Sequence, residues 1–241
     1  MGGARYDGVA ETYAAGADDY SVPATRCLLE LAGQVDGLRV LDVACGHGLI
    51  ARDMARRGAQ VVGVDVASRL LQRAEALEAS RSLGISYLHA DATLPGLLAG
   101  EFFDVIVCNF GLSDIDNLDD LCINVARLLA PGGRFVFSIL HPCFPGVTDV
   151  SGSWPTMGRY YDEGWWRADG ELSALRREVG ANHRMVSTYL NAVTVNGLAL
   201  DAMAEPEPDE QWAQRRHGAE ALPVYLVVRC VRTDRPSLPP P

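Results

Sequence analysis

The chain has 241 residues, 48% of them hydrophobic, which is enough for one sizeable α/β domain, so residues 1–241 are expected to form a single domain. Its formal net charge is −10 and Lys and Arg do not cluster, which argues against a nucleic-acid partner, because contact with phosphate backbones needs clustered cations. It has no apolar run of membrane-spanning length, no apolar signal-peptide core and no C-x-x-C pair among six cysteines, so we expect a reduced, cytoplasmic protein without a membrane partner.

Residues 1–35 are expected to form a helical lid ahead of the first strand. Leu28, Leu29 and Leu31 pattern as one apolar helix face. Two aromatic residues, Tyr6 and Tyr13, precede that helix, and a pair packed against the domain is one interpretation of them.

The most informative stretch is residues 40–48, where an apolar strand leads into an acid, small residues and a Gly-x-Gly. A helix follows over 49–57 and ends at Gly58. A sharp turn from strand to helix with a ligand against the backbone needs small residues. The start of the helix also offers unpaired N–H groups. The pattern therefore predicts a ligand-binding corner.

Two kinds of ligand suit this corner. Gly46, Gly48 and Ala51 satisfy the dinucleotide fingerprint, with Asp65 at the expected ribose position. A tight turn without a ligand is also open, as is a helix-capping role for Asp42 and Asp65. Asp42 favours a cationic ligand, because a carboxylate ahead of the glycines would repel a pyrophosphate. S-adenosylmethionine carries an ammonium and a sulfonium and no phosphate.

Strands and helices then alternate, which predicts a doubly wound, mostly parallel sheet with right-handed crossovers. The near-continuous apolar strand at 103–108 indicates burial on both faces. Asp114 and Asp116 are interpreted as caps of a helix that begins at Leu118. The expected elements of this region are strands at 61–64, 85–89, 103–108 and 134–140 and helices at 68–82 and from 118 onward.

Residues 142–185 interrupt the alternation with an aromatic insertion. It follows the fifth strand, and ligands in open α/β sheets bind beyond the carboxyl ends of the strands. We therefore expect a substrate cap in which Tyr160, Tyr161, Trp165 and Trp166 contact the substrate. A small satellite core or a contact between protomers is the alternative.

Histidines supply the candidate catalytic groups. His141 ends the strand at 134–140 and is expected at the rim, where it could remove a proton. The alternative is a buried histidine bonded to a backbone carbonyl. His183 is the second candidate, with a helix-cap or surface role as its alternative, and His47 is expected to be exposed. No histidine or cysteine spacing fits a metal site, so no metal is expected.

The last third of the chain is expected to complete the sheet. A helix is predicted at 187–196 and strands at 198–204 and 223–231. The acidic stretch 205–210 is interpreted as a solvated turn, and the proline-rich tail 236–241 is expected to be disordered.

Five stretches together resemble the class I S-adenosylmethionine-dependent methyltransferases. The corner resembles the first motif of that family, with Ala44 in place of its first glycine. The resemblance implies a seven-stranded, Rossmann-like methyltransferase fold in which strand 223–231 inserts antiparallel between the fifth and sixth strands. The further stretches, in the order of the family's later motifs, are residues 60–65, 89–92, 103–110 and 128–138.

The same resemblance implies S-adenosylmethionine as the cofactor. Asp65 would take the ribose hydroxyls, and Asp91 with Ala92 the adenine. In the family an aromatic residue of the N-terminal segment closes over the methionine end, which points to Tyr13, with Tyr6 toward the substrate. The other implied cofactor residues, from the glycine loop and the end of the fourth strand, are Asp42, Ala44, Cys45, Gly46, Gly48, Asn109 and Phe110.

The leading function is thus an enzyme that moves a methyl group from S-adenosylmethionine to an oxygen or nitrogen of a small molecule, secondary metabolites included. One alternative is a methyltransferase fold turned cyclase, decarboxylase or non-catalytic partner. The other is a nicotinamide-dependent oxidoreductase. A small-molecule substrate is the expected partner, and a homodimer is left open.

Overall fold

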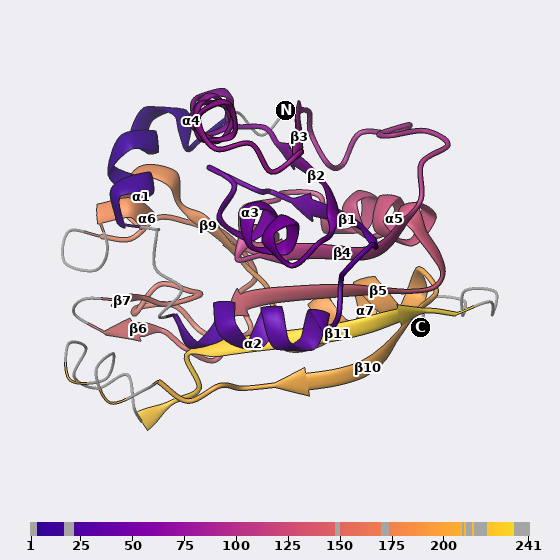
Figure 1. The fold of residues 1–241 in the computed structure, drawn as a ribbon. Helices are drawn as coiled ribbons and strands as arrows, with labels where there is room; N and C mark the ends of the chain where they lie inside the picture. The colour runs from indigo at the N-terminus through magenta and orange to yellow at the C-terminus, as the bar shows by residue number, and fades with distance from the viewer. Residues whose placement is uncertain are drawn as a thin grey trace.

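The computed structural model describes residues 4–16, 22–147, 150–169, 174–208, 210, 214 and 221–233. A seven-stranded sheet crosses the molecule, with helices on both of its faces (Figure 1). Its strands are β1 (Arg39–Val43), β2 (Gln60–Asp65), β3 (Ser86–His89), β4 (Phe103–Asn109), β5 (Leu129–Leu140), β10 (Leu198–Ala204) and β11 (Tyr225–Arg232).

The strand order across the sheet is β10-β11-β5-β4-β1-β2-β3. Neighbouring strands are parallel except for β11, which runs antiparallel to both β5 and β10. This confirms the predicted fold class, including the antiparallel strand between the fifth and sixth. The chain proceeds outward from β1 in one direction and from β4 in the other. Strand order therefore reverses between β1 and β4, and a ligand crevice is expected at their carboxyl ends.

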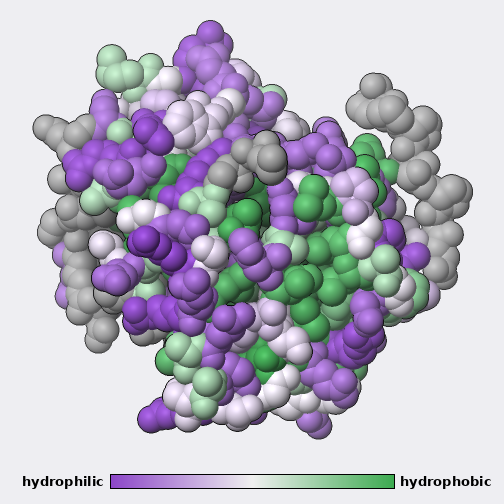
Figure 2. All heavy atoms as spheres, turned by 90° about the horizontal axis from the view of Figure 1, so that it is seen from above, coloured by the Kyte–Doolittle hydropathy of each residue, from purple (hydrophilic) through white to green (hydrophobic). Residues whose placement is uncertain are grey.

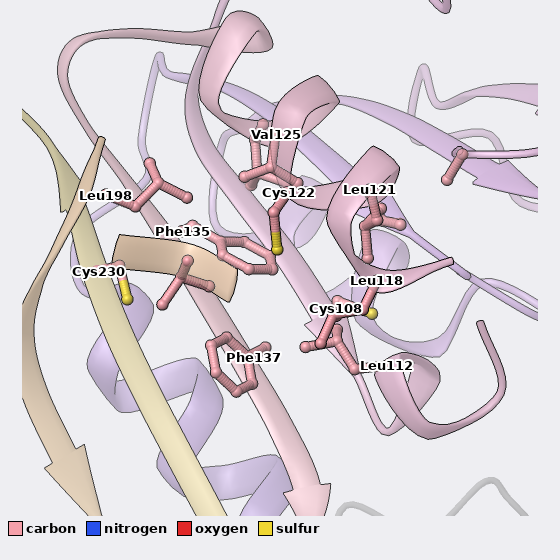
Figure 3. Packing of buried hydrophobic residues seen from close by; sticks show 14 of the residues in the cluster. Cys108, Leu112, Leu118, Leu121, Cys122, Val125, Phe135, Phe137, Leu198 and Cys230 are labelled. Atoms are coloured by element: carbon pink, nitrogen blue, oxygen red, sulfur yellow. The ribbon is translucent and has the colours of Figure 1, made fainter. Parts of the chain in front are cut away.

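Helices bury both faces of the sheet. On one face lie α2 (Pro23–Ala32) and α3 (Leu49–Arg56), and on the other lie α5 (Leu118–Leu128) and α7 (Val186–Val195). Strand β5 alternates between them, because successive side chains of a strand point to opposite faces. Phe135 and Phe137 pack with α5 (Figure 3), whereas Val136 packs with α2. Burial on both sides explains why β4 is apolar at each position from Val105 to Cys108.

The observed boundaries differ from the predicted ones at β5. The strand was expected from residue 134, but it begins at Leu129, because Leu129 already pairs with Phe103 of β4. The pairing shifts register after Phe103, and Gly132 takes a positive φ of 72° within the strand. The predicted tail at 236–241 lies outside the described residues.

The segments on either side of the core are built from short elements. The N-terminal part has a 3₁₀ turn at Asp7–Val9 and α1 (Ala10–Gly16), both beside α4 (Ser68–Ser80). A further 3₁₀ turn, η2, follows β4. The described residues of the insertion include two small antiparallel sheets, β6–β7 and β8–β9, and the short helix α6. Their bounds are β6 (Gly146–Val147), β7 (Val150–Ser151), β8 (Gly164–Trp166), α6 (Ala174–Val179), β9 (Ala181–His183) and η2 (Gly111–Ser113).

Candidate active site

A cavity of about 670 Å³ opens at the carboxyl ends of β1, β2 and β4, where the strand order reverses. Drug-sized ligands occupy cavities of roughly 300–1,000 Å³, so it can hold a nucleoside-sized molecule. A smaller cavity of about 120 Å³ shares several wall residues with it, including Tyr13, Gly46 and Phe110. The predicted site residues on one or both walls are Tyr6, Tyr13, Asp42, Ala44, Cys45, Gly46, Asp65, Asp91, Asn109 and Phe110.

The glycine loop has the backbone that the motif predicts. Gly46 has a φ of 56°, in the left-handed region that favours glycine, and its backbone lies on both cavity walls. Gly48 also has a positive φ, 88°, but lies on neither wall; a Cβ there would come within 2.3 Å of the Tyr87 hydroxyl. Gly48 thus permits packing against β3 rather than ligand contact.

Ala44, the departure from the family motif, keeps the conformation of the glycine it replaces. Its φ is 54°, an uncommon value for a residue with a Cβ. The methyl group faces Gly111, where an added Cβ would come within 2.6 Å of it. The chain thus accommodates the extra methyl group by having no side chain at Gly111.

Asp42 is a buried carboxyl with no cation partner among the described residues. It is 1% exposed, and its Oδ2 accepts the Ala51 N–H in the first turn of α3 at 3.0 Å. Burial raises the pKa of Asp42 to about 8, against the lowering effect of the Ala51 hydrogen bond. The side chain also lies on the wall of the smaller cavity, so the helix-cap geometry and the ligand-facing position occur together. A cationic ligand would supply the missing charge.

Asp65 ties the glycine loop to the end of β2. Its two carboxyl oxygens accept the N–H groups of Gly46 and Ala67, each at 2.7 Å. Burial raises its pKa, although these bonds oppose the shift. Asp91 accepts both the N–H and the hydroxyl of Thr93. Ala92 lies on neither wall; it is buried, and its carbonyl accepts a hydrogen bond from Asn124.

The entrance beside these acids is apolar. Val66 and Leu94 line the large cavity while 40% and 54% exposed, and neither was predicted from the sequence. Figure 2 shows the molecule from above, with a patch of hydrophobic side chains among hydrophilic ones. Two apolar side chains at an open edge suit a flat ring such as adenine.

Both N-terminal tyrosines reach the large cavity. Tyr6 and Tyr13 meet edge-to-face with ring centroids 5.0 Å apart, so they form a packed pair and also line the site. Burial raises the pKa of Tyr13 to about 12. The ring of His47 lies 6.1 Å from that of Tyr13, and His47 is buried, so the expectation that it is exposed is wrong.

The end of β4 supplies a polar and an aromatic wall residue. The side-chain amide oxygen of Asn109, Oδ1, accepts a hydrogen bond from the Ser138 hydroxyl at 2.7 Å, which fixes the orientation of the amide. Phe110 adopts a left-handed φ of 60°, and its ring meets that of Tyr225 edge-to-face. Both residues line both cavities, as the predicted assignment requires.

The two candidate catalytic histidines do not line either cavity. His141 is buried; its Nε2 bonds the Glu205 carboxylate at 2.9 Å and its Nδ1 accepts the Cys143 N–H. Burial lowers the pKa of His141, and Glu205 opposes the shift. His183 is 1% exposed and its Nε2 bonds the Tyr160 carbonyl, so it neither caps α7 nor lies on the surface.

The four cap aromatics also lie away from both cavity walls. Trp166 is buried with Ala168 and Ala181, and its indole N–H bonds the Ser153 carbonyl. Trp166 thus lies in a small satellite core, and the cap role of the four aromatic residues stays a prediction. Of the others, the Tyr160 hydroxyl accepts the Val186 N–H, Tyr161 is 69% exposed, and Trp165 lies against Arg5 and Arg167.

A charged cluster that the sequence reasoning missed also lines the large cavity. The Asp114 carboxylate bonds the Arg176 guanidinium at 2.5 Å and the Tyr6 hydroxyl at 2.8 Å. Asp116 pairs with Arg5 at 2.6 Å. The expectation that both aspartates cap α5 is wrong, because the cap is Asn117, which accepts the Asp120 N–H. The partners are far apart in sequence, and no spacing signal joins them.

Two further expectations concern metals and membranes. Among the described residues, no group of three His, Cys, Asp or Glu side chains could hold a metal ion. Over the same part of the chain, no helix combines the length and apolar character of a membrane span.

The fold and this cavity define a Rossmann-like protein with a site for a cationic nucleoside. Residues 41–137 match the family model of a methyltransferase domain. The chain is 31% identical to the S-adenosylmethionine-dependent methyltransferase of Mesorhizobium loti, with 90% of this chain and 99% of that one covered and a TM-score of 0.69. The chain therefore belongs to the S-adenosylmethionine-dependent methyltransferase family.

Two more comparisons place it within that family. A putative S-adenosylmethionine-dependent methyltransferase of Listeria monocytogenes is 26% identical, covers 89% of this chain and 100% of its own, and gives a TM-score of 0.70. A ubiquinone biosynthesis O-methyltransferase of Alkalilimnicola ehrlichii is 39% identical over 116 residues. That match spans 45% of this chain and 44% of the relative, less than half of either.

The residues present fit S-adenosylmethionine. The open backbone at Gly46 and the unpaired buried acid Asp42 suit its cationic methionine end. Asp65 and Asp91 offer acceptors to its hydroxyls and amine, and the apolar edge of Val66 and Leu94 suits its ring. A nicotinamide dinucleotide lacks this support, because its pyrophosphate would lie near several carboxyls. The two arginines among the described wall residues, Arg5 and Arg176, are already paired with carboxylates.

Proposed function

We propose that this chain transfers the methyl group of S-adenosylmethionine to an oxygen or nitrogen of a small molecule, with oxygen favoured by its curated relatives. The observation that carries the proposal is that the glycine loop, Asp65, Asp91 and the end of β4 line the same large cavity. When bound, S-adenosylmethionine supplies an electrophilic methyl group on a sulfonium, which leaves as a neutral thioether.

The chain's own contribution is mainly positioning. Holding two reactants in line converts a bimolecular step into an effectively unimolecular one, which supplies several kcal/mol. Asp42, Asp65 and Asp91 would orient the cofactor, and Tyr13 and Phe110 would exclude water from the methionine end. The acceptor would lie beyond them, toward the charged cluster. His141 and His183 stay proposals as proton acceptors, and the same holds for the lid, the aromatic cap, a cytoplasmic location and a homodimer.

Calorimetry with S-adenosylmethionine, S-adenosylhomocysteine and NAD tests the cofactor. We expect micromolar dissociation constants for the first two, about −8 kcal/mol, and no competition by NAD. Asp65→Ala should weaken binding by about 1–3 kcal/mol, because the ribose loses a charged acceptor. Tighter binding of NAD than of S-adenosylmethionine would overturn the proposal, and transfer of a labelled methyl group to a phenol or amine panel would complete it.

A further inference from the structure

One part of the wall of the large cavity is charged. We call the wall formed by Arg5, Tyr6, Asp114, Asp116 and Arg176 the acceptor end. These residues come from three segments that are distant in the sequence: the N-terminal segment, the loop after β4, and α6 of the insertion. Under the proposed function, the methyl acceptor would lie against this wall, because the predicted cofactor residues other than Tyr13 come from the glycine loop and from the ends of the strands.

Both cations of the acceptor end already have carboxylate partners. Arg176 is 7% exposed and bonds Asp114 at 2.5 Å. The Arg5 guanidinium reaches both carboxylate oxygens of Asp116, at 2.6 and 2.7 Å. Among the described residues that line the large cavity, these two arginines are the only cationic side chains. A carboxylate or phosphate entering this cavity would therefore find each guanidinium held by an internal anion.

Acidic groups outnumber basic ones around the same space. Among the described lining residues, Asp65 and Asp91 face the large cavity together with Asp114 and Asp116, whereas the cations there are Arg5 and Arg176. A cleft lined by one sign of charge concentrates the opposite sign and repels its own. The Asp114 oxygens hold one described hydrogen bond each, from Tyr6 and Arg176. An ionised carboxylate offers about four lone-pair sites, so Asp114 can accept a further hydrogen bond from a hydroxyl or ammonium.

We propose that the acceptor end selects neutral or cationic methyl acceptors that donate a hydrogen bond, and rejects acceptors that carry a carboxylate or phosphate beside the reacting group. The Arg5–Asp116 and Arg176–Asp114 pairs set this preference by occupying the cations of the wall. That the ligand of this wall is a methyl acceptor rests on the proposed function. The charge preference of the cavity can be measured without catalysis.

Three phenols of similar size form the test: 4-ethylphenol, tyramine and 4-hydroxyphenylacetate, which are neutral, cationic and anionic at neutral pH. Their dissociation constants are measured by calorimetry on the full chain saturated with S-adenosylhomocysteine. We expect the anion to bind at least about tenfold more weakly than the neutral phenol, because like charges brought together cost binding energy. Binding of the anion as tight as or tighter than the neutral phenol would overturn the proposal.

A variant pair assigns the preference to the acceptor end. Asp116→Asn releases Arg5, so the gap between anionic and neutral phenols should close. Glu101→Gln is the matched control: it removes the same charge and breaks the exposed Arg39–Glu101 pair, which lies on neither cavity wall. The proposal fails if Asp116→Asn leaves the ratio of the two dissociation constants unchanged, or if Glu101→Gln closes the gap equally.

A thiol reporter gives a result even if none of the phenols binds. Leu175→Cys places a thiol on the large cavity wall, in a chain whose Cys27 and Cys143 are replaced by serine. Rates with cationic and anionic methanethiosulfonates are compared with those of Met157→Cys, where the native side chain is 91% exposed. A cation preference at position 175 above that at 157 is expected, and equal ratios would overturn the proposal. Absence of S-adenosylmethionine binding would instead contradict the proposed function alone.

Discussion

At the scale of single residues, the buried acid Asp42 carries the clearest pH signature. The pKa of Asp42 is about 8 in the folded chain, whereas an ordinary aspartate, as in the unfolded chain, has a pKa near 4. Between these two pH values the folded chain holds a proton that the unfolded chain has released. Stability contributed by this group therefore falls as pH rises from about 4 to 8. A cationic ligand favours the ionised carboxyl, so binding should release protons in the same window.

The prediction uses Asp42→Asn, which keeps the acceptor for the Ala51 N–H but cannot ionise. Its unfolding free energy should rise relative to the native chain as pH increases from 4 to 8. At pH 8 its affinity for S-adenosylmethionine should be weaker than that of the native chain. The affinity of the native chain should increase with pH, and that of the variant should not. Urea titrations and calorimetry in two buffers of different ionisation enthalpy measure both effects, and identical pH profiles for the two chains would contradict the assignment.

His141 has two competing roles that kinetics can separate. If His141 is a general base, His141→Ala should lower kcat by about a hundredfold or more and remove an ascending limb of the pH–rate profile. As a structural link from β5 to Glu205, its loss should lower the melting temperature and leave that limb in place. Glu205→Gln is the control, because it weakens the link but keeps the imidazole. From the bonding of both ring nitrogens, we expect the structural outcome.

At the scale of elements, the glycine loop and the turn after β4 depend on each other. Gly111→Ala should be strongly destabilising, because its Cβ would meet the Ala44 methyl group at 2.6 Å and the Cys108 sulfur at 2.8 Å. Ala44→Gly removes that methyl group and the strain of a left-handed alanine. The removed strain should add about 1–2 kcal/mol to the free energy of unfolding, before the entropy of the glycine in the unfolded chain is subtracted.

A double variant measures the coupling. The loss in Gly111→Ala should shrink when Ala44→Gly is also present, but part should remain because of Cys108. Thermal and urea unfolding of the four chains give the coupling free energy. Full additivity would show that the two methyl positions do not meet.

At the scale of the whole molecule, one buried ion pair joins three distant segments. Arg176 of the insertion bonds Asp114 of the turn after β4, and both bond the Tyr6 hydroxyl of the N-terminal segment. Asp114→Asn should cost about 3–5 kcal/mol, because it leaves a buried guanidinium without its anion. Arg176→Met in the same chain should recover part of that loss, as urea unfolding would measure. The exposed Arg39–Glu101 pair is the comparison, and Glu101→Gln should cost no more than about 1 kcal/mol.

Local patterns determined the fold class and most of the residues that line the glycine-loop side of the cavities. Apolar runs, helix periodicity and the Gly-x-Gly corner are properties of neighbouring residues, so they could be recognised without a structure. The position of Asp65, Asp91 and Asn109 on the cavity wall could be predicted for the same reason. Asp65 and Asn109 end strands and Asp91 follows one closely, and parallel strands end at one edge of a sheet.

Only the tertiary structure decided which residues form the charged wall of the cavity. Arg5 and Asp116 are 111 positions apart and Asp114 and Arg176 are 62 apart, so no periodicity relates them. The direction in which a rim residue points was equally hidden: His141 turns to Glu205, and Trp166 turns into a small core of the insertion. Sequence spacing sets where a strand ends, whereas the packing of distant segments sets which side chains meet across the space beyond it.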